Sequence, residues 1–306
     1  MIHNGLISIL NLRFSNPIQT QLSSLPVRFG GIGIRKISDL YLPAFLSSIN
    51  ATLDLVSSIM SNQLEDTSSV SSFLSGFNAW SVLNGPVTPL QPNFQKCWDE
   101  INILRMINNI KPSSDKDKAR FLAAQFPYSG AWLNSIPCSN LGTQMEDNCF
   151  QIAIALILGL DICLPHKCKC GELVDRSGTH GLSCEFSAGR SSRHRELNSI
   201  IRQALSSAHI PSRLEPNGLI RSDGKRPDGI TEIPWLNGKH LVWDATCSDT
   251  MAPSNIAACS RNAGASANNA VNRKRSTYKQ IIDQGHLFVA VSVETLGTFS
   301  TETYFY

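Results

Sequence analysis

Three cysteines and one histidine lie close together near the middle of the 306-residue chain. They form the array Cys168-x-Cys170-x9-His180-x3-Cys184. Structural zinc sites use such ligands, and cysteines of a tight turn can face a histidine and a cysteine that are one helical turn apart. The spacing therefore predicts one closed, four-ligand zinc site with a structural role.

Two alternatives to this zinc site stay open. Cys163 and His166 precede the array, and either could replace one of the four ligands. The four residues could also be a reduced thiol pair near an unrelated histidine. The chain has nine cysteines, an odd number, and no recognisable export signal, which favours thiols or metal ligands over a disulfide framework.

A second candidate site involves two aspartates of a predicted β-hairpin. Asp228 is expected at the start of one strand and Asp244 within the next, after the turn at Asn237-Gly238. Paired carboxylates hold a hard cation such as Mg²⁺, which lowers the pKa of a bound water and shields a phosphate. Arg226 lies two residues before Asp228 and shares its strand face, where a guanidinium could bind a phosphate oxygen.

Lys274 belongs to a helix that is predicted over residues 254–284. It lies on one stripe with Ala267, Val271 and Tyr278, and side chains at this spacing should face the sheet. Lys274 is therefore expected to point toward the two carboxylates. The alternative for the whole set is an Arg-Pro-Asp turn, an edge aspartate and a lysine whose ammonium reaches solvent.

The elements that must position these residues follow the order α, β, β, β, α, β in the last third of the chain. A serine-capped helix leads to a short strand, the hairpin comes next, and a long helix and a buried strand end the series. Their ranges are 193–208, 213–214, 226–230, 240–247, 254–284 and 287–293. Earlier in the chain, helical spacing covers residues 38–60, 94–124 and 143–160. The fold class is therefore α/β (α+β).

Charge and hydropathy limit the partners. The net charge of +3 arises in the second half, where basic residues gather between 186 and 226 and between 261 and 279. Such a surface favours a polyanion over a merely solvated helix face. The longest apolar run, residues 150–160, is shorter than the roughly 18 to 20 residues of a bilayer crossing, so no membrane span is expected. The N-terminus shows no signal-peptide pattern, which predicts an intracellular protein.

Several short motifs occur in a fixed order. They are Cys168-x-Cys170-Gly171, Gly178-Thr-His180-Gly-Leu-Ser-Cys184, Gly189-Arg190, Arg193-His194, Glu215-Pro216, Gly224-Lys-Arg-Pro-Asp-Gly229, Trp243-Asp-Ala-Thr246 and Lys274 to Tyr278. In this order they resemble the C-terminal part of non-LTR retrotransposon polyproteins that carry a restriction-like endonuclease. In that family a reverse transcriptase precedes a zinc knuckle, an Arg-His pair and a PD-(D/E)XK nuclease.

The resemblance implies a restriction-endonuclease-like core of order αβββαβ in residues 191–306, preceded by a zinc knuckle in residues 161–190. Residues 1–92 would be a remnant of the polymerase thumb with a flexible linker, and residues 93–160 a helical connector. DNA is the implied partner, with the RNA of the element as a second candidate, and the nucleus is the implied location.

The resemblance also implies roles for the site residues in Mg²⁺-dependent hydrolysis of DNA. Asp228 and Asp244 would hold Mg²⁺, and Glu215 is a further acidic candidate. Lys274 would orient or activate water, because Thr246 stands where the general motif has lysine. The expected nucleic-acid-binding residues are Arg190, Arg193, His194, Arg226 and Arg275. The nick would leave a 3′ hydroxyl that primes reverse transcription.

One departure from the family concerns the polymerase. No adjacent Asp-Asp pair occurs in the chain, so we expect a fragment or truncated copy without a polymerase active site. A rival interpretation is a catalytically inactive, zinc-containing DNA-binding remnant of such an element. A third is a structural zinc protein with no role in nucleic-acid chemistry.

Overall fold

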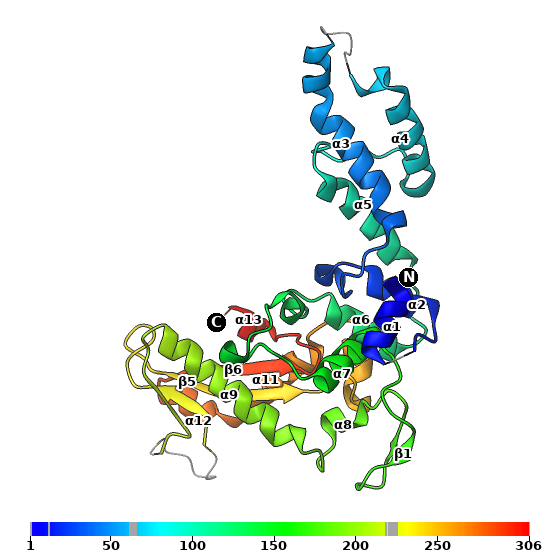
Figure 1. Ribbon diagram of the computed structural model, residues 1–306. Coiled ribbons are helices and arrows are strands. Elements are labelled where there is room, and N and C mark those ends of the chain that lie inside the picture. The colour runs from blue at the N-terminus through cyan, green and yellow to red at the C-terminus, as the bar shows by residue number, and fades with distance from the viewer. Residues whose placement is uncertain (1, 12, 61–65, 218, 220–225, 306) are drawn as a thin grey trace. The chain divides into compact units, whose positions relative to one another are not determined.

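The chain forms two compact units (Figure 1). The computed structural model describes residues 2–11, 13–60, 66–217, 219 and 226–305. Unit 1 comprises residues 1–15, 27–31 and 112–306, and unit 2 comprises residues 16–26 and 32–111. The boundary at 111–112 therefore falls inside the segment 93–160 that the sequence suggested as one connector.

Unit 2 is helical. Its elements are α2 (Pro17–Ser24), α3 (Ile37–Ile59), the short 3₁₀ helix η2 (Thr67–Ser69), α4 (Ser71–Asn84) and α5 (Gln95–Asn109). Leu42 and Leu46 of α3 are buried against Phe73, Trp80 and Trp98 of the other two long helices. The rings of Trp80 and Trp98 meet edge to face with centroids 5.1 Å apart, which is a favourable aromatic geometry.

Helix α3 is, among the described residues, the one helix that is long and apolar enough to cross a membrane by length and composition alone. The run 150–160, which guided the sequence prediction, is mostly the shorter helix α7 (Asp147–Leu158). Leu42 and Leu46 of α3 pack on α4 and α5, while 22% of its apolar window is buried inside the structure.

The helical part of unit 1 contains α1 (Ile2–Leu10), η1 (Val27–Phe29), α6 (Asp115–Ala124), η3 (Ala131–Asn134), η4 (Ser139–Leu141) and α7. The predicted helix 94–124 is divided into α5 and α6, because Pro112 cannot continue a helix and Ser114 caps the next one. Gly297 packs so closely that a Cβ there would lie 3.2 Å from the Ser129 carbonyl oxygen. Ser129, before the Cys and His array in the chain, therefore packs against Gly297, after it, and both belong to unit 1.

A small hairpin and a short helix come after α7. They are β1 (His166–Lys167), β2 (Leu173–Val174) and α8 (His180–Ser183), and the two strands pair antiparallel. The rest of the unit is built on a four-stranded sheet with the strand order β3-β4-β5-β6. The elements of this part are α9 (Gly189–Ser207), β3 (Ser212–Leu214), β4 (Gly229–Thr231), β5 (Leu241–Ser248), α10 (Pro253–Cys259), α11 (Ala265–Thr277), α12 (Lys279–Asp283), β6 (Leu287–Glu294) and α13 (Thr301–Phe305).

The mixed α and β class is confirmed. In the last third of the chain, α9 precedes three strands, three helices follow β5, and β6 and α13 come after them. The strands β3, β4 and β5 are antiparallel neighbours, whereas β5 and β6 run parallel. Asn237 and Gly238 both have positive φ, 51° and 72°, as a tight hairpin turn requires. This turn leads into β5 as predicted.

Two sequence predictions about helices of unit 1 are wrong. The single helix expected over residues 254–284 is three helices, with one break that ends at Gly264, whose φ is +79°, and a second at Tyr278. The sequence prediction missed the break at Gly264 because the alanine- and asparagine-rich residues on both sides of it fit one continuous helical pattern. Helix α9 begins at Gly189 rather than near Arg193, and no serine side chain caps it.

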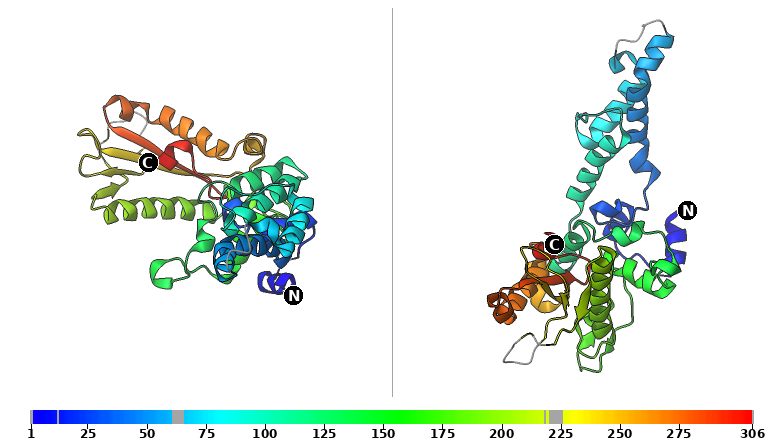
Figure 2. Two further views of the ribbon diagram at one scale, coloured as in Figure 1. Left: turned by 90° about the horizontal axis from the view of Figure 1, so that it is seen from above. Right: turned by 90° about the vertical axis from the view of Figure 1, so that its left-hand side faces the viewer.

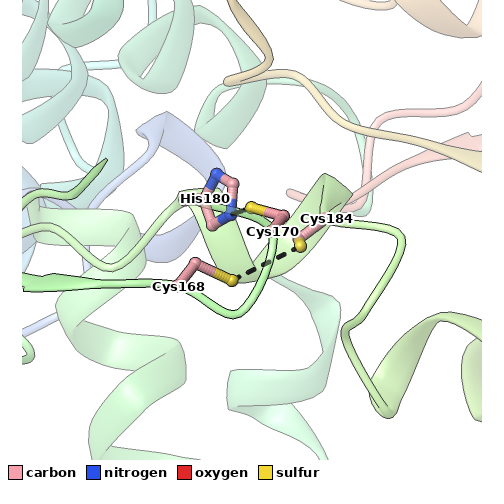
Figure 3. Close-up of side chains that lie close together, drawn as sticks. All are labelled: Cys168, Cys170, His180 and Cys184. Atoms are coloured by element: carbon pink, nitrogen blue, oxygen red, sulfur yellow. Dashed lines mark hydrogen bonds between the residues drawn. The ribbon is translucent and has the colours of Figure 1, made fainter. Parts of the chain in front are cut away.

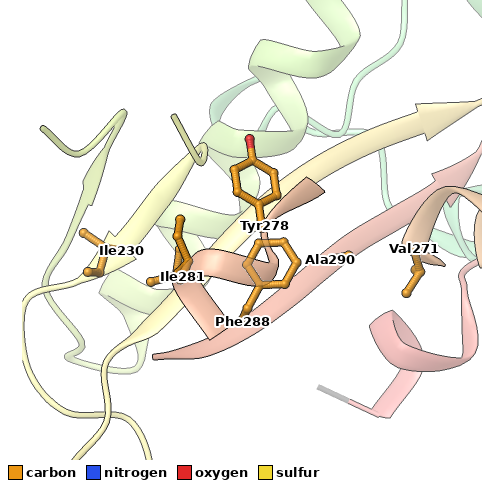
Figure 4. Close-up of a cluster of buried hydrophobic side chains, with 7 residues drawn as sticks. Ile230, Val271, Tyr278, Ile281, Phe288 and Ala290 are labelled. Atoms are coloured by element: carbon orange, nitrogen blue, oxygen red, sulfur yellow. The ribbon is translucent and has the colours of Figure 1, made fainter. Parts of the chain in front are cut away.

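The core of the sheet lies between β-strands and the helices after β5 (Figure 4). It is a set of buried side chains made of Ile230, Val242, Val271, Tyr278, Ile281, Phe288 and Ala290. Successive strand residues point to opposite faces, so Trp243 faces away from this core, toward α9. Helices α9 and α11 therefore cover opposite faces of the sheet (Figure 2).

Candidate metal centre and carboxylate site

The four predicted zinc ligands converge in the structure (Figure 3). Their ligand atoms all lie within 4.8 Å of one another. Cys168 Sγ lies 3.6 Å from Cys184 Sγ, and Cys170 Sγ lies 3.2 Å from His180 Nε2. A tetrahedral zinc with its usual bond lengths separates its ligand atoms by about 3.5 to 3.8 Å, so the donor set and spacing fit zinc.

Local turns produce this convergence. The Gly171 N–H donates to the Cys168 carbonyl at 2.9 Å, and Gly171 has a φ of +93°, which glycine adopts without strain. On the other side, the Cys184 N–H donates to the His180 carbonyl at 3.0 Å across the single turn of α8. Each pair of ligands is thus held by its own short segment.

The electrostatics of the cluster favour one thiolate, at Cys168, whereas burial and the neighbouring thiols raise the pKa of Cys170. A backbone hydrogen bond from Cys170, together with side-chain hydrogen bonds from Cys170 and His180, lowers the pKa of the Cys168 thiol to about 6. Metals bind the thiolate rather than the thiol. The sulfur and imidazole donors therefore suit a soft or borderline cation such as zinc.

Cys163 and His166 lie outside the cluster. The Cys163 thiol donates to the Asp175 carbonyl at 3.3 Å, and His166 Nδ1 lies 2.9 Å from the Leu164 carbonyl oxygen. Both residues contact the backbone of the hairpin region instead of joining the four ligand atoms. The four-residue set predicted first is the one that the structure assembles.

Asp228 is the residue directly before β4, and the pairing of β4 with β5 sets its position. Gly229 pairs with Trp243, and Asp228 Oδ2 accepts the Ala245 N–H at 2.7 Å. A Cβ on Gly229 would lie 2.0 Å from the Trp243 indole, so only glycine fits beneath this ring. The close approach of the two strands brings the Asp228 carboxylate to the edge of β5.

Asp244 is buried on the opposite sheet face from Trp243, with only 3% of its surface exposed. Lys274 Nζ lies 2.5 Å from Asp244 Oδ2, and the Tyr278 hydroxyl lies 2.7 Å from Oδ1. The buried positions of Ala267, Val271 and Tyr278 show that their stripe of α11 and its C-cap faces the sheet, as the sequence predicted. Lys274 therefore points inward.

The pKa of Asp244 is raised from its ordinary value. Burial is the main cause, and the negative charge of Asp228 acts in the same direction. The ammonium of Lys274 and the Tyr278 hydroxyl oppose this shift but do not cancel it. The negative charge of Asp228 therefore acts on the Asp244 carboxylate.

The other predicted site residues have varied surroundings. Glu215 is exposed, and its backbone N–H donates to the Asp228 carbonyl at 2.8 Å. Arg226 Nη1 donates to Asn217 Oδ1 at 3.0 Å, and Arg275 forms an ion pair with Glu302 at 2.6 Å. Gly224 and Lys225, which precede Arg226 in the motif, lie outside the described residues.

The remaining three predicted nucleic-acid-binding residues, Arg190, Arg193 and His194, lie in the first turns of α9. Arg190 is exposed. Arg193 Nη2 donates to the Leu182 carbonyl, which links α9 to the α8 turn beside the Cys and His cluster. His194 Nε2 lies 3.0 Å from Asp228 Oδ2. The structure therefore brings His194, Asp228, Asp244 and Lys274 into one neighbourhood and leaves Arg190 at the surface.

Sequence reasoning missed one buried acid. Glu294 Oε1 accepts the N–H groups of Ser266 and Ala267 at 2.9 and 3.2 Å, and Oε2 accepts the Thr250 hydroxyl at 2.9 Å. Glu294 thus caps the first turn of the helix that carries Lys274. The available signal was an acidic residue at the end of an otherwise apolar strand.

The chain matches no family model and no curated protein sequence. Its function is therefore inferred from the geometry and chemistry of its own residues.

Proposed function

We propose that unit 1 is a divalent-metal-dependent endonuclease that hydrolyses a DNA phosphodiester. The observation that carries this proposal is the ion pair between Asp244 and Lys274, with Asp244 also within electrostatic reach of Asp228. Asp228 and Asp244 come from adjacent strands and would hold the cation. The Lys274 ammonium lies 2.5 Å from Asp244 Oδ2 and would supply a positive charge beside it.

The carboxylates are suited to Mg²⁺ by their chemistry, because hard cations prefer oxygen ligands. The contacts of the Asp228 side chain with His194 and the Ala245 N–H are both at Oδ2, so Oδ1 would be its ligand atom, and Asp244 would be the second ligand. When bound, Mg²⁺ would lower the pKa of a water and offset charge on the phosphate.

The residues of the chain itself would orient the reactants. Lys274, with about a third of its side chain exposed, can exchange its contact with Asp244 for one with water or a phosphate oxygen. Tyr278 holds Asp244 from the buried side, and its hydroxyl also lies 2.8 Å from the Arg226 carbonyl oxygen. Arg226 is exposed two residues before Asp228 and would bind phosphate through its guanidinium.

We further propose that this domain is the restriction-like nuclease of a non-LTR retrotransposon fragment. The αβββαβ order, the Cys and His cluster in front of it and the lysine on the following helix support this proposal. The zinc cluster would have a structural role, DNA would be the substrate, and the nucleus would be the place of action. The nick would leave a 3′ hydroxyl as a primer.

A plasmid-nicking assay tests the catalytic proposal. Wild-type protein should nick in Mg²⁺ or Mn²⁺, and Asp244→Ala should reduce nicking to background because a cation ligand is lost. Lys274→Ala should lower the rate by about 10²- to 10³-fold with metal dependence retained, because only a positioned charge is removed. Asp283→Ala, at an exposed position of α12, is a control that should nick as wild type does.

A second candidate function is DNA binding without turnover. It is favoured by one observation, namely that both Asp244 oxygens already contact Lys274 and Tyr278. In that case wild-type protein would bind DNA with a steep salt dependence, with a log-log slope of about 0.9 per neutralised phosphate, and would nick in neither cation. Nicking by Asp244→Ala at the wild-type rate would show that Asp244 takes no part in the reaction and would overturn the proposed site.

A further inference from the structure

We propose that His194 is a positioning residue that fixes the Asp228 carboxylate for cation binding, rather than a residue that binds phosphate. This inference rests on the proposed nuclease function and deepens it. It concerns a contact between the first turns of α9 and the residue before β4, which are 34 positions apart in the chain.

Two donors from different elements approach the same carboxylate oxygen. His194 Nε2 lies 3.0 Å from Asp228 Oδ2, and the Ala245 N–H donates to that oxygen at 2.7 Å. An ionised carboxylate only accepts hydrogen bonds, so Nε2 must carry its proton here. Together the two donors prevent rotation of the carboxylate and leave Oδ1 as its free oxygen among the described contacts.

The helix face explains why His194 is held at this point. His194, Asn198 and Leu205 lie on one stripe of α9, and the latter two are buried. Asn198 Oδ1 accepts the Trp243 indole N–H at 3.1 Å, and Trp243 pairs with Gly229, the residue after Asp228. The strand pair that carries both aspartates therefore also anchors the helix that carries His194.

The same contact argues against a phosphate-binding role. One of the two ring nitrogens, Nε2, is engaged by Asp228, and the negative charge of that carboxylate offsets the attraction of the ring for an anion. Arg195, the next residue, is exposed and has no such partner among the described residues. Arg195 is thus the better phosphate-binding residue at this end of α9.

Hydrogen bonds to metal-ligating groups fix their orientation, and removing such a partner typically weakens metal affinity or activity by about 10- to 100-fold. The expected effect of losing His194 is therefore on the cation and not on DNA affinity. A residue that only stabilised the fold would not separate these two quantities.

The test compares His194→Ala, His194→Gln and the matched control Arg195→Ala, each purified with its zinc retained. Mn²⁺ binding is measured by calorimetry without DNA, and DNA affinity is measured without added divalent cation. His194→Ala should weaken Mn²⁺ binding by about tenfold or more with DNA affinity unchanged. His194→Gln, whose amide can donate to Asp228, should restore most of the Mn²⁺ affinity. Arg195→Ala should weaken DNA binding and leave Mn²⁺ binding unchanged.

The contrary outcomes are distinct. Unchanged Mn²⁺ affinity in His194→Ala, with weaker DNA binding, would overturn the inference and make His194 a phosphate-binding residue. Equal losses in His194→Ala and His194→Gln, accompanied by a lower unfolding temperature in both, would make its role purely structural. Wild-type protein that binds Mn²⁺ in a His194-dependent way but nicks no DNA would overturn the nuclease function alone. Wild-type protein that binds no Mn²⁺ would overturn both.

Discussion

The Cys and His cluster and the carboxylate site are built in opposite ways within one unit. All four ligands of the cluster lie between Cys168 and Cys184, on one turn and one short helix. The carboxylate site takes His194 from α9, Asp228 from the start of β4, Asp244 from β5 and Lys274 from α11. The first site depends on local turns and a metal, and the second depends on strand register and helix packing.

This difference predicts which changes damage each site. A local site is disrupted by removing its ligands, and the rest of the unit should survive. A site assembled from distant segments is disrupted by changes in packing that touch none of its functional groups. Four sets of variants separate these two kinds of damage, from the largest expected effect to the smallest.

The Cys168→Ser plus Cys184→Ser double variant should lose its zinc and the ordered structure of the β1, β2 and α8 region. Removing half the ligands of a closed site removes the binding free energy that folds it. Metal analysis should fall from one zinc per chain to none, and amide protection should disappear from residues 166–184 but persist in β5 and β6. Cys138→Ser plus Cys149→Ser, two cysteines outside the cluster, is the matched control. Full zinc retention in the first variant would exclude the site.

Gly229→Ala should destabilise the sheet by about 3 kcal/mol while zinc stays bound. The added Cβ would lie 2.0 Å from the Trp243 indole, which forces the two strands apart. Urea unfolding monitored by tryptophan fluorescence measures the loss. Gly181→Ala, where a Cβ meets no atom within 4 Å, should change stability far less. Similar losses in the two variants would contradict the close strand approach.

Arg193→Ala should lower stability by about 1.5 kcal/mol, because it removes a charged hydrogen bond to the Leu182 carbonyl that joins α9 to α8. The loss should appear as faster amide exchange in both helices, since the contact joins the two sites. Arg190→Ala, at an exposed position of the same helix, should have little effect. If faster exchange were confined to α9, the contact between Arg193 and Leu182 would not couple the stability of α9 to that of α8.

Asp244→Asn should have the smallest effect on stability, with a defined dependence on pH. Burial raises the pKa of Asp244, so wild-type stability falls as pH rises from the unfolded-state pKa through the higher folded-state pKa. The neutral asparagine avoids this loss, so the variant should gain unfolding temperature relative to wild type as the pH rises above the ordinary aspartate pKa of about 4. Thermal unfolding without added divalent cation measures the difference. A relative gain that grows toward acidic pH would have the wrong sign.

Part of this architecture could be predicted because its signals are local. The ligand spacing at Cys168 and His180, the Asn237-Gly238 turn and the stripe from Ala267 to Tyr278 each depend on a few neighbouring residues. The break at Gly264 was missed because the residues around it suit a helix on either side. The role of Glu294 was missed because its partners, the first N–H groups of α11, lie 27 and 28 positions away.

The sequence by itself determined the Cys and His cluster, the mixed α and β class and the inward face of α11, since hydrophobic period and turn chemistry act over one or two turns. Only the tertiary structure decided that His194 meets Asp228, that Arg193 contacts the α8 backbone and that Arg275 pairs with Glu302. Each of these contacts joins two elements whose spacing is set by how the whole sheet packs. A charged side chain at a helix surface has the same sequence pattern whether it faces a phosphate or another residue of its own chain.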